Sequence, residues 1–252
     1  MRKSILILSI AAALAVPGIA AAQAPAAAAP ASDHTISGNM GLFSEYRFRG
    51  ISQTYEKPAF QGGFDYSHAS GLYAGNWNSN VSETLYSGAS LEMDFYGGYK
   101  KSFGDIGLDV GAIYYYYPGS DAAGIGKIDN TEVYIGGSWK WLSAKYYYAV
   151  SDFFSAPDTK GSTYLDLSAT FDLGSGWGVV GHYGMQKVKN ISTADYNDWK
   201  LGVTKDLGNG WNVSAAYIDT DAEEAAYTFT NAAGKSKFLG DTTFVLSVGK
   251  TF

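Results

Sequence analysis

The chain has 252 residues, a net charge of −6, no cysteine and only three histidines. The lack of cysteine excludes disulfides, zinc-thiolate sites and thiol catalysis, the shortage of histidine disfavours a histidine-rich metal site, and the negative charge disfavours nucleic acid as a partner. We expect no metal and no cofactor. Aromatic residues make up 15% of the chain and glycine contributes 31 residues, a combination that favours many strands joined by turns.

The N-terminus has the pattern of a secretory signal peptide. Arg2 and Lys3 precede an apolar stretch, residues 5–16, and three alanines at 20–22 offer a cleavage site before Gln23. We assign residues 1–22 to a cleaved signal peptide and the Ala/Pro-rich residues 23–34 to a flexible leader. The alternative, a transmembrane anchor, would need a longer apolar run.

From residue 35 to 252 the hydrophobic pattern has period two, which is typical of strands. The first segment, residues 36–49, places one apolar set on a single face: Ile36, Met40, Leu42, Tyr46 and Phe48. The other face carries Glu45, Arg47 and Arg49. One face can therefore meet lipid while the other carries full charges.

Eleven further segments repeat this alternation, at residues 60–66, 72–79, 91–99, 106–114, 131–139, 142–148, 164–171, 177–185, 199–204, 211–217 and 243–252. The segment 72–79 is blurred, and we expect Tyr73 and Trp77 to be its outward rings. A further set of tyrosines should point inward: Tyr96, Tyr115, Tyr117, Tyr134, Tyr147 and Tyr164.

The connections alternate strictly in length along the chain. The long ones are residues 51–58, 80–90, 118–130, 151–162, 187–197 and 219–241, and the short ones are 68–71, 102–105, 140, 173–176 and 207–210. Outer-membrane barrels combine short periplasmic turns with longer extracellular loops in this way. We therefore predict that residues 35–252 form an all-β, up-and-down antiparallel transmembrane barrel of about 12 strands in the bacterial outer membrane.

The alternative fold is a soluble β-sandwich or lipocalin-like barrel with an apolar interior. Mid-strand charges and rings near strand ends argue against that alternative. The last segment ends on an aromatic residue, Phe252, which follows Phe244, Leu246 and Val248 on one face. Such an ending is similar to the signal read by the outer-membrane assembly machinery. Outer-membrane lipid and lipopolysaccharide are the other expected partners.

Residues 44–54, SEYRFRGISQT, resemble the TorF family of porins. The likeness continues at residues 71–75, 109–119, 131–134, 142–148 and 217–221, and covers essentially the whole mature chain. The resemblance implies passive diffusion across the outer membrane. It implies no catalytic residues and settles no substrate.

The predicted inner face carries charges that would be costly against lipid, so we expect them to line the pore. This pore-lining set is Glu45, Arg47, Arg49, Asp65, Glu92, Asp94, Asp109, Glu132, Lys145, Asp166 and Lys200. They either set the selectivity of a wet pore or pair across a packed interior. Arg47 and Arg49 form either an anion-contacting ladder or a salt-bridge network with Asp65 or Glu92.

The preferred function is therefore passive passage of small hydrophilic solutes or ions through a narrow charged lumen, and not catalysis. A non-conducting structural or adhesive barrel that acts through its loops is the main alternative. An outer-membrane lipid enzyme is a remote one, because His182, Ser162, Asp166 and Ser168 lie in no elbow motif and do not assemble a triad in sequence. The acidic run at residues 219–224 is interpreted as a solvated loop rather than a calcium site.

Overall fold

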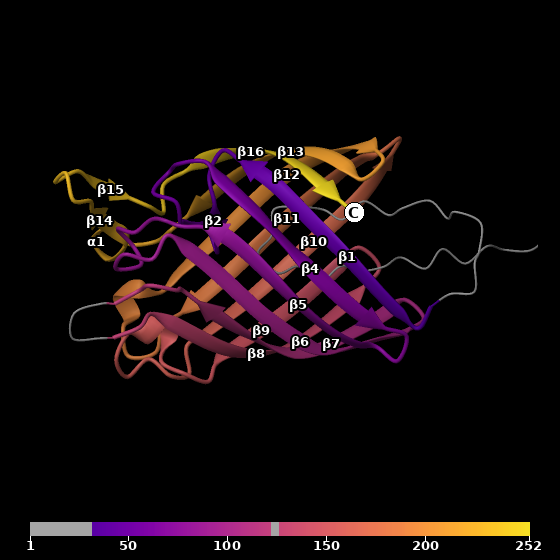
Figure 1. Cartoon of the computed structure of the whole chain (residues 1–252), viewed down its shortest axis with the longest axis horizontal. Helices are drawn as coiled ribbons and strands as arrows, with labels where there is room; N and C mark the ends of the chain where they lie inside the picture. Colours follow the sequence, from indigo (N-terminus) through magenta and orange to yellow (C-terminus); the bar gives the residue numbers. More distant parts are fainter. Residues whose placement is uncertain (1–31, 122–125) are drawn as a thin grey trace, which may run out of the picture.

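The computed structural model describes residues 32–121 and 126–252 (Figure 1). The predicted signal peptide, residues 1–22, and most of the predicted leader lie outside the described residues. Twelve antiparallel strands close into one barrel, which confirms the predicted fold class. The barrel strands are β1 (His34–Phe43), β4 (Ala59–His68), β5 (Leu72–Asn80), β6 (Leu91–Phe103), β7 (Ile106–Tyr116), β8 (Asp129–Trp139), β9 (Leu142–Ala149), β10 (Thr163–Gly174), β11 (Trp177–Lys187), β12 (Tyr196–Gly208), β13 (Trp211–Thr220) and β16 (Thr243–Thr251).

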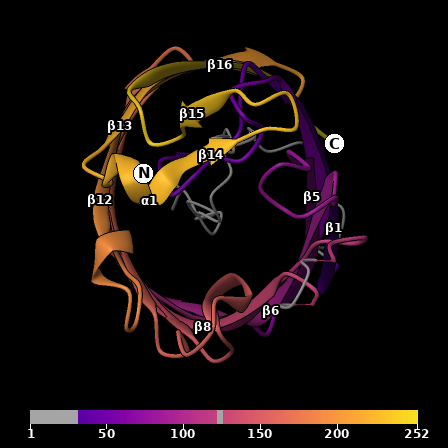
Figure 2. The same ribbon diagram turned by 90° about the vertical axis from the view of Figure 1, so that its left-hand side faces the viewer.

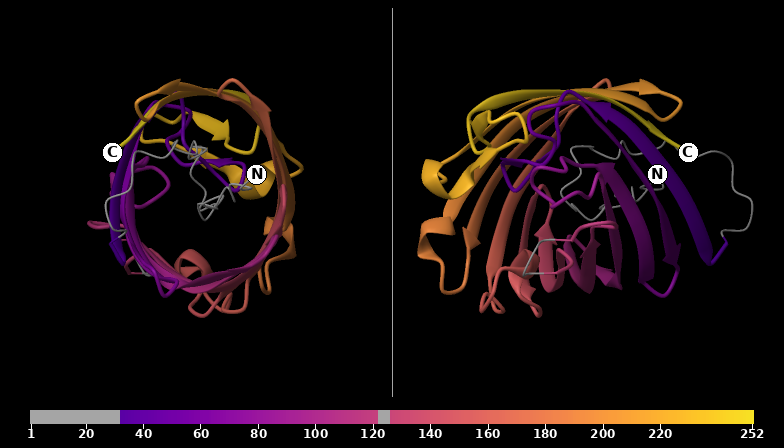
Figure 3. Two further views of the ribbon diagram at one scale, coloured as in Figure 1. Left: turned by 90° about the vertical axis from the view of Figure 1, so that its right-hand side faces the viewer. Right: turned by 60° about the vertical axis from the view of Figure 1, so that its left-hand side comes forward.

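Strands that follow one another in the chain pair around the ring, and β1 closes it by pairing with both β4 and β16. The end-on view in Figure 3 shows the closed ring. Closure leaves no strand edge unpaired, so the backbone N–H and C=O groups of the wall bond within the sheet. No helix among the described residues is long and apolar enough to span a membrane.

The two ends of the barrel differ in the length of their connections. At one end the turns are tight, as at Asn209–Gly210, where both residues have positive φ (52° and 77°). This conformation suits the twist of a two-residue hairpin. The other end carries the long connections and their small elements (left in Figure 1). These are β2 (Arg47–Phe48), β3 (Ile51–Ser52), η1 (Phe153–Ser155), η2 (Ser192–Ala194), α1 (Glu224–Tyr227), β14 (Thr228–Thr230) and β15 (Ser236–Phe238).

The two faces of the wall have opposite character. Large apolar side chains project outward and remain exposed, for example Ile135 (60%), Leu201 (61%) and Phe244 (70%). The six tyrosines predicted to point inward are all buried. The outer face is therefore the apolar one, as a barrel surrounded by hydrocarbon requires.

Two details of the predicted alternation are wrong. The first strand ends at Phe43 rather than continuing to residue 49, and Tyr46 and Phe48, predicted to face outward, are buried inside the barrel. In β5 the phase is reversed, because Tyr73 and Trp77 face inward and are 9% and 4% exposed. Aromatic rings are common on the lipid face of barrels, but this inner wall is also built of rings, so ring identity did not distinguish the two faces.

The inward position of Trp77 can be tested by fluorescence. A variant that keeps Trp77 as its only tryptophan should be quenched weakly by lipids with brominated acyl chains, because this ring lies behind the wall. A matched variant that keeps only Trp139, which is 51% exposed on the outer face, should be quenched strongly. Equal quenching of the two variants would contradict the assigned phase of β5.

Candidate functional site in the barrel lumen

A chain segment folds into the barrel from its loop end. We call residues 45–55 the inserted segment; every one of them is buried. It follows β1 and lies inside the ring of strands in Figure 2, drawn in purple. Within it β2 and β3 pair as a hairpin whose tip is Arg49–Gly50. Glu45, Arg47 and Arg49 therefore belong to this segment and not to the barrel wall, where the sequence pattern had placed them.

The tip of the hairpin fits closely against the wall. Both tip residues have positive φ, 48° at Arg49 and 80° at Gly50. A Cβ on Gly50 would lie 2.4 Å from Cγ2 of Thr220 and 2.8 Å from Cβ of Asp198, so only glycine fits there. Arg49 adopts a conformation that is costly for a residue with a side chain, and such strain persists only where surrounding contacts hold it.

Arg49 supplies those contacts by binding the wall opposite β1. Its Nη2 lies 2.6 Å from Oε2 of Glu132 on β8, and its Nη1 donates to Oε1 of Gln186 on β11 at 2.8 Å. The guanidinium also lies over the ring of Tyr164 on β10, 4.2 Å from its centroid. Since β9 is six places from β1 in the ring of twelve, the inserted segment crosses the lumen.

Arg47 fixes the base of the same segment. Its Nε lies 2.9 Å from Oε1 of Glu45, and its Nη1 donates to the carbonyl oxygens of Leu239 at 2.7 Å and Asp241 at 3.0 Å. The segment is thereby bound to the connection that leads into β16. The two arginines do not form a ladder on one strand, and their acidic partners are Glu45 and Glu132 rather than the predicted Asp65 or Glu92.

Three more predicted charges are buried around the inserted segment. Glu92, Asp94 and Glu132 are 1%, 6% and 0% exposed. Glu92 accepts a hydrogen bond from the Tyr117 hydroxyl at 2.8 Å, and Glu132 accepts one from Tyr115 at 3.2 Å. This part of the lumen is a packed layer of carboxylates, arginines and tyrosine rings.

The remaining predicted charges are more accessible. Five of them are half-buried: Asp65, Asp109, Lys145, Asp166 and Lys200. The Lys145 ammonium lies 2.7 Å from Oδ2 of Asp109. The hydroxyl of Tyr96 donates to Asp65 at 2.6 Å. Water therefore reaches charged groups on the inner wall away from the packed layer.

The structure corrects one expectation about catalysis, because it brings a serine, a histidine and an aspartate together. Oγ of Ser168 lies 3.2 Å from Nδ1 of His182, whose Nε2 lies 2.9 Å from Oδ1 of Asp198. Asp198 was not in the predicted set, because only the pairing of β11 with β12 places it beside His182.

This arrangement is a poor catalytic triad. Ser168 donates its proton to Oδ1 of Asp166 at 2.6 Å, and Oδ2 of Asp166 lies 3.4 Å from Nδ1 of His182. A carboxylate therefore lies near each ring nitrogen, an arrangement that favours the doubly protonated ring, which has no lone pair with which to take the serine proton. The arrangement of Asp166, His182 and Asp198 is better suited to placing charged groups on the inner wall of the barrel.

The acidic run at residues 219–224 is used in loop contacts. Asp219 accepts a hydrogen bond from Thr242 at 2.7 Å, and Asp221 accepts one from the side chain of Asn197 at 2.7 Å. Within residues 32–121 and 126–252, no group of three or more acidic or histidine side chains could hold a metal ion.

Comparison with known proteins identifies the family of this chain. The family model described as "Bacterial protein of unknown function (Gcw_chp)" matches residues 27–252. The chain belongs to the Gcw_chp family. No curated protein matches the chain at a significant level.

The Gcw_chp chain is similar in fold to solved porins. The KdgM porin superposes with a TM-score of 0.55 at 8% identity, covering 86% of this chain and 99% of that one. A second KdgM structure, in complex with disordered oligogalacturonate, gives a TM-score of 0.53 at 8% identity and covers 86% and 98%. The NanC porin gives a TM-score of 0.51 at 10% identity and covers 86% and 99%. At these identities the likeness establishes a porin-like barrel fold and nothing finer.

Proposed function

We propose that this Gcw_chp protein is a porin-like channel for passive, weakly selective passage of small hydrophilic solutes or ions across the outer membrane. The observation that carries the proposal is the contrast between the two faces of one closed wall. The outside is apolar, whereas the inside presents solvent-accessible charges such as Asp65, Lys145 and Lys200. Charges on the wall of a narrow pore bias which ions enter.

The width of the path is set by the inserted segment. A barrel of about eight strands is filled by side chains and one of about 16 encloses an aqueous channel, so twelve strands leave an intermediate lumen. Part of that lumen is occupied by residues 45–55. The proposed path runs beside this segment, or opens when the segment is displaced from the wall that Arg49 contacts.

A second candidate is a non-conducting structural or adhesive barrel that acts through its loops. The observation that favours it is the same inserted segment, whose arginine is bound to the far wall. An outer-membrane lipid enzyme has less support, because His182 is on the inner face and flanked by carboxylates.

Finer assignments remain part of the proposal. These are the TorF resemblance, the pore-lining role of the eleven predicted residues, export by a cleaved signal peptide, and recognition of Phe252 by the assembly machinery. Because one KdgM structure contains oligogalacturonate, acidic oligosaccharides are a class of solute worth testing here.

The proposal is tested by single-channel recording of the refolded mature protein, residues 23–252, in a planar bilayer. We expect discrete current steps. Asp65→Asn should shift the ion selectivity toward anions and Lys200→Gln toward cations, because each removes one accessible wall charge of known sign. The paired variants are matched controls for general damage to the pore. A folded, inserted barrel that passes no current would instead favour the structural candidate.

A further inference from the structure

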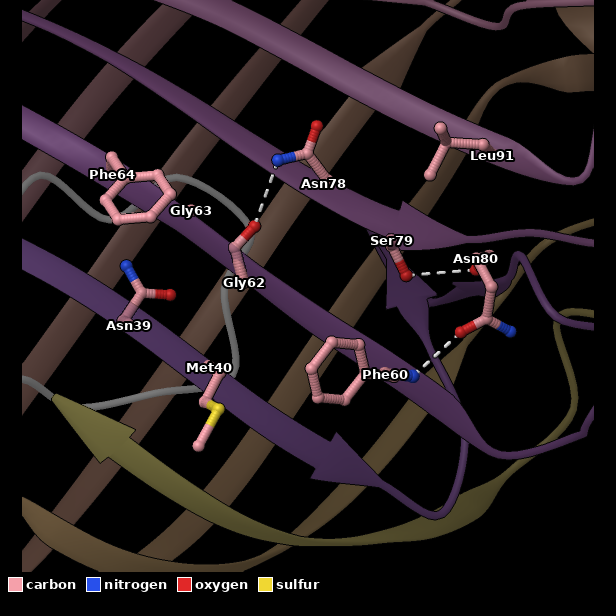
Figure 4. Close-up of a pocket in the computed structure, with 10 residues that line it drawn as sticks. All are labelled: Asn39, Met40, Phe60, Gly62, Gly63, Phe64, Asn78, Ser79, Asn80 and Leu91. Carbon is pink, nitrogen blue, oxygen red and sulfur yellow. Dashed lines mark hydrogen bonds between the residues drawn. The ribbon is translucent and has the colours of Figure 1, made fainter.

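The outer face of the barrel carries a groove that spans β1, β4, β5 and β6 (Figure 4). Its volume is about 430 Å³, and its apolar walls are formed by Met40, Phe60, Phe64 and Leu91. Gly62 lies in its floor, where a Cβ would come within 2.6 Å of the carbonyl oxygen of Asn39. The hollow therefore cannot be filled by a side chain at that position. All of these residues except Phe64, which is just past the midpoint of β4, lie in the half of their strands nearer the long loops.

One edge of the groove is polar, which is unusual for a surface that faces hydrocarbon. Asn76, Asn78 and Asn80 alternate along the outer face of β5. Their orientation follows from the register, because Asn76 pairs directly with Phe64 and Phe95, which are 69% and 44% exposed. In hydrocarbon each carboxamide group that lacks a hydrogen-bond partner is costly.

Most of these carboxamide groups are satisfied within the wall. Asn76 donates to the carbonyl oxygen of Asp94 at 3.0 Å. Asn78 donates to Oδ1 of Asn76 at 2.6 Å and to the carbonyl oxygen of Gly62 at 3.2 Å, the bond drawn in Figure 4. Asn80 donates to the Pro58 carbonyl and accepts from the Phe60 N–H. Oδ1 of Asn78 has no hydrogen-bond partner among the described residues.

Two kinds of free group remain at this edge. Asn76 and Asn80 each donate only one of their two amide hydrogens, whereas Oδ1 of Asn78 is a free acceptor. Both amide hydrogens of Asn78 are already donated, so it offers only an acceptor. A second copy related by a two-fold axis that passes through Asn78 would place acceptor against acceptor. An ordinary phospholipid chain carries only ester carbonyls near its head. These are acceptors, so they can satisfy the free amide hydrogen of Asn80 but not Oδ1 of Asn78. A chain with a hydroxyl group near its head supplies the missing donor.

We propose that this groove binds a hydroxylated acyl chain of an outer-leaflet lipid, the chemistry that lipopolysaccharide provides. The apolar walls contact the chain and Oδ1 of Asn78 accepts from its hydroxyl. The groove has the right depth for the outer leaflet, since it lies toward the end of the barrel that carries the long loops. This proposal requires that the protein is inserted in the outer membrane, but it does not require that the barrel conducts ions. A failure of the proposed channel function would therefore leave the lipid site unaffected.

The test is native mass spectrometry of the intact mature barrel released from detergent micelles. The probes are lipid A with hydroxylated acyl chains and a synthetic analogue of equal chain length without the acyl hydroxyls. We expect the wild-type protein to retain lipid A about two- to tenfold better than the analogue, the effect of one hydrogen bond. Asn78→Leu should abolish this preference. Met40→Trp should fill the groove and reduce retention of both probes.

Ile135→Trp, on the outer face of β8, is the matched control and should leave retention of both probes unchanged. Heat-modifiable migration in gels verifies that each variant is folded. Equal retention of the two probes by wild-type protein would overturn the proposal. So would a hydroxyl preference that survives in Asn78→Leu, or a dimer that excludes both lipids and is lost in Met40→Trp.

Discussion

Arg49→Gln is expected to raise the single-channel conductance several-fold and to make the open state more frequent. The guanidinium of Arg49 joins the inserted segment to Glu132 and Gln186 on the far wall. Removing one partner of a buried ion pair costs about 3–5 kcal/mol, because the other charge is left uncompensated. The substitution therefore destabilises the conformation in which the inserted segment contacts the far wall, and the segment should leave that wall more often.

A charge exchange provides the control for this result. The double variant Arg49→Glu with Glu132→Arg restores an ion pair of reversed direction and should recover much of the wild-type conductance. Glu132→Gln alone should resemble Arg49→Gln, since it breaks the same contact. If Arg49→Gln folds and inserts but conducts like the wild-type protein, the inserted segment does not limit the path.

Ile135→Arg is expected to destabilise the barrel in lipid vesicles by about 2–4 kcal/mol, the cost of an arginine at the midplane on the lipid face of a transmembrane barrel. Ile135 is in the middle of β8 and 60% exposed on the outer face. The measurement is the free energy of unfolding by denaturant in bilayers of defined thickness.

Ser138→Arg is the matched control for that substitution. It adds the same charge to the same strand, but on the inner face near the turn end, and should lower the free energy of unfolding by no more than about 1 kcal/mol. A soluble barrel with an apolar interior would give the opposite order, with the inner-face arginine more damaging than the outer-face one.

The order of the strands, and the phase of every barrel strand except β5, could be predicted from the sequence because period-two patterning is a local property. Each of the twelve predicted segments overlaps one barrel strand. The pattern failed where local alternation continued past the end of a strand. Residues 44–49 still alternate, yet β1 ends at Phe43 and the chain turns into the lumen. Nothing in the alternation itself distinguishes a wall strand from a hairpin packed against a wall.

The contacts of the candidate site depend on partners far away in the chain. Arg49 pairs with Glu132, 83 positions later, and with Gln186, 137 positions later. Only closure of the ring brings β8 and β11 opposite β1. One local signal was available: the pair Arg49–Gly50 ends in the glycine that a tight hairpin with positive φ requires.

The seam between β1 and β16 has a consequence for the order of assembly. It has five paired positions, whereas β1 and β4 share ten. Every other junction of the wall joins barrel strands that follow one another in the chain, so the seam brings together the most distant partners and its loop-closure cost is greatest. The inserted segment starts at this seam, since the N–H of Ser44 bonds to the carbonyl oxygen of Leu246 at 2.8 Å, and Arg47 binds the residues that lead into β16. The lumen should therefore stay unobstructed in a nascent, unsealed barrel, and become occupied in the same kinetic step that seals it.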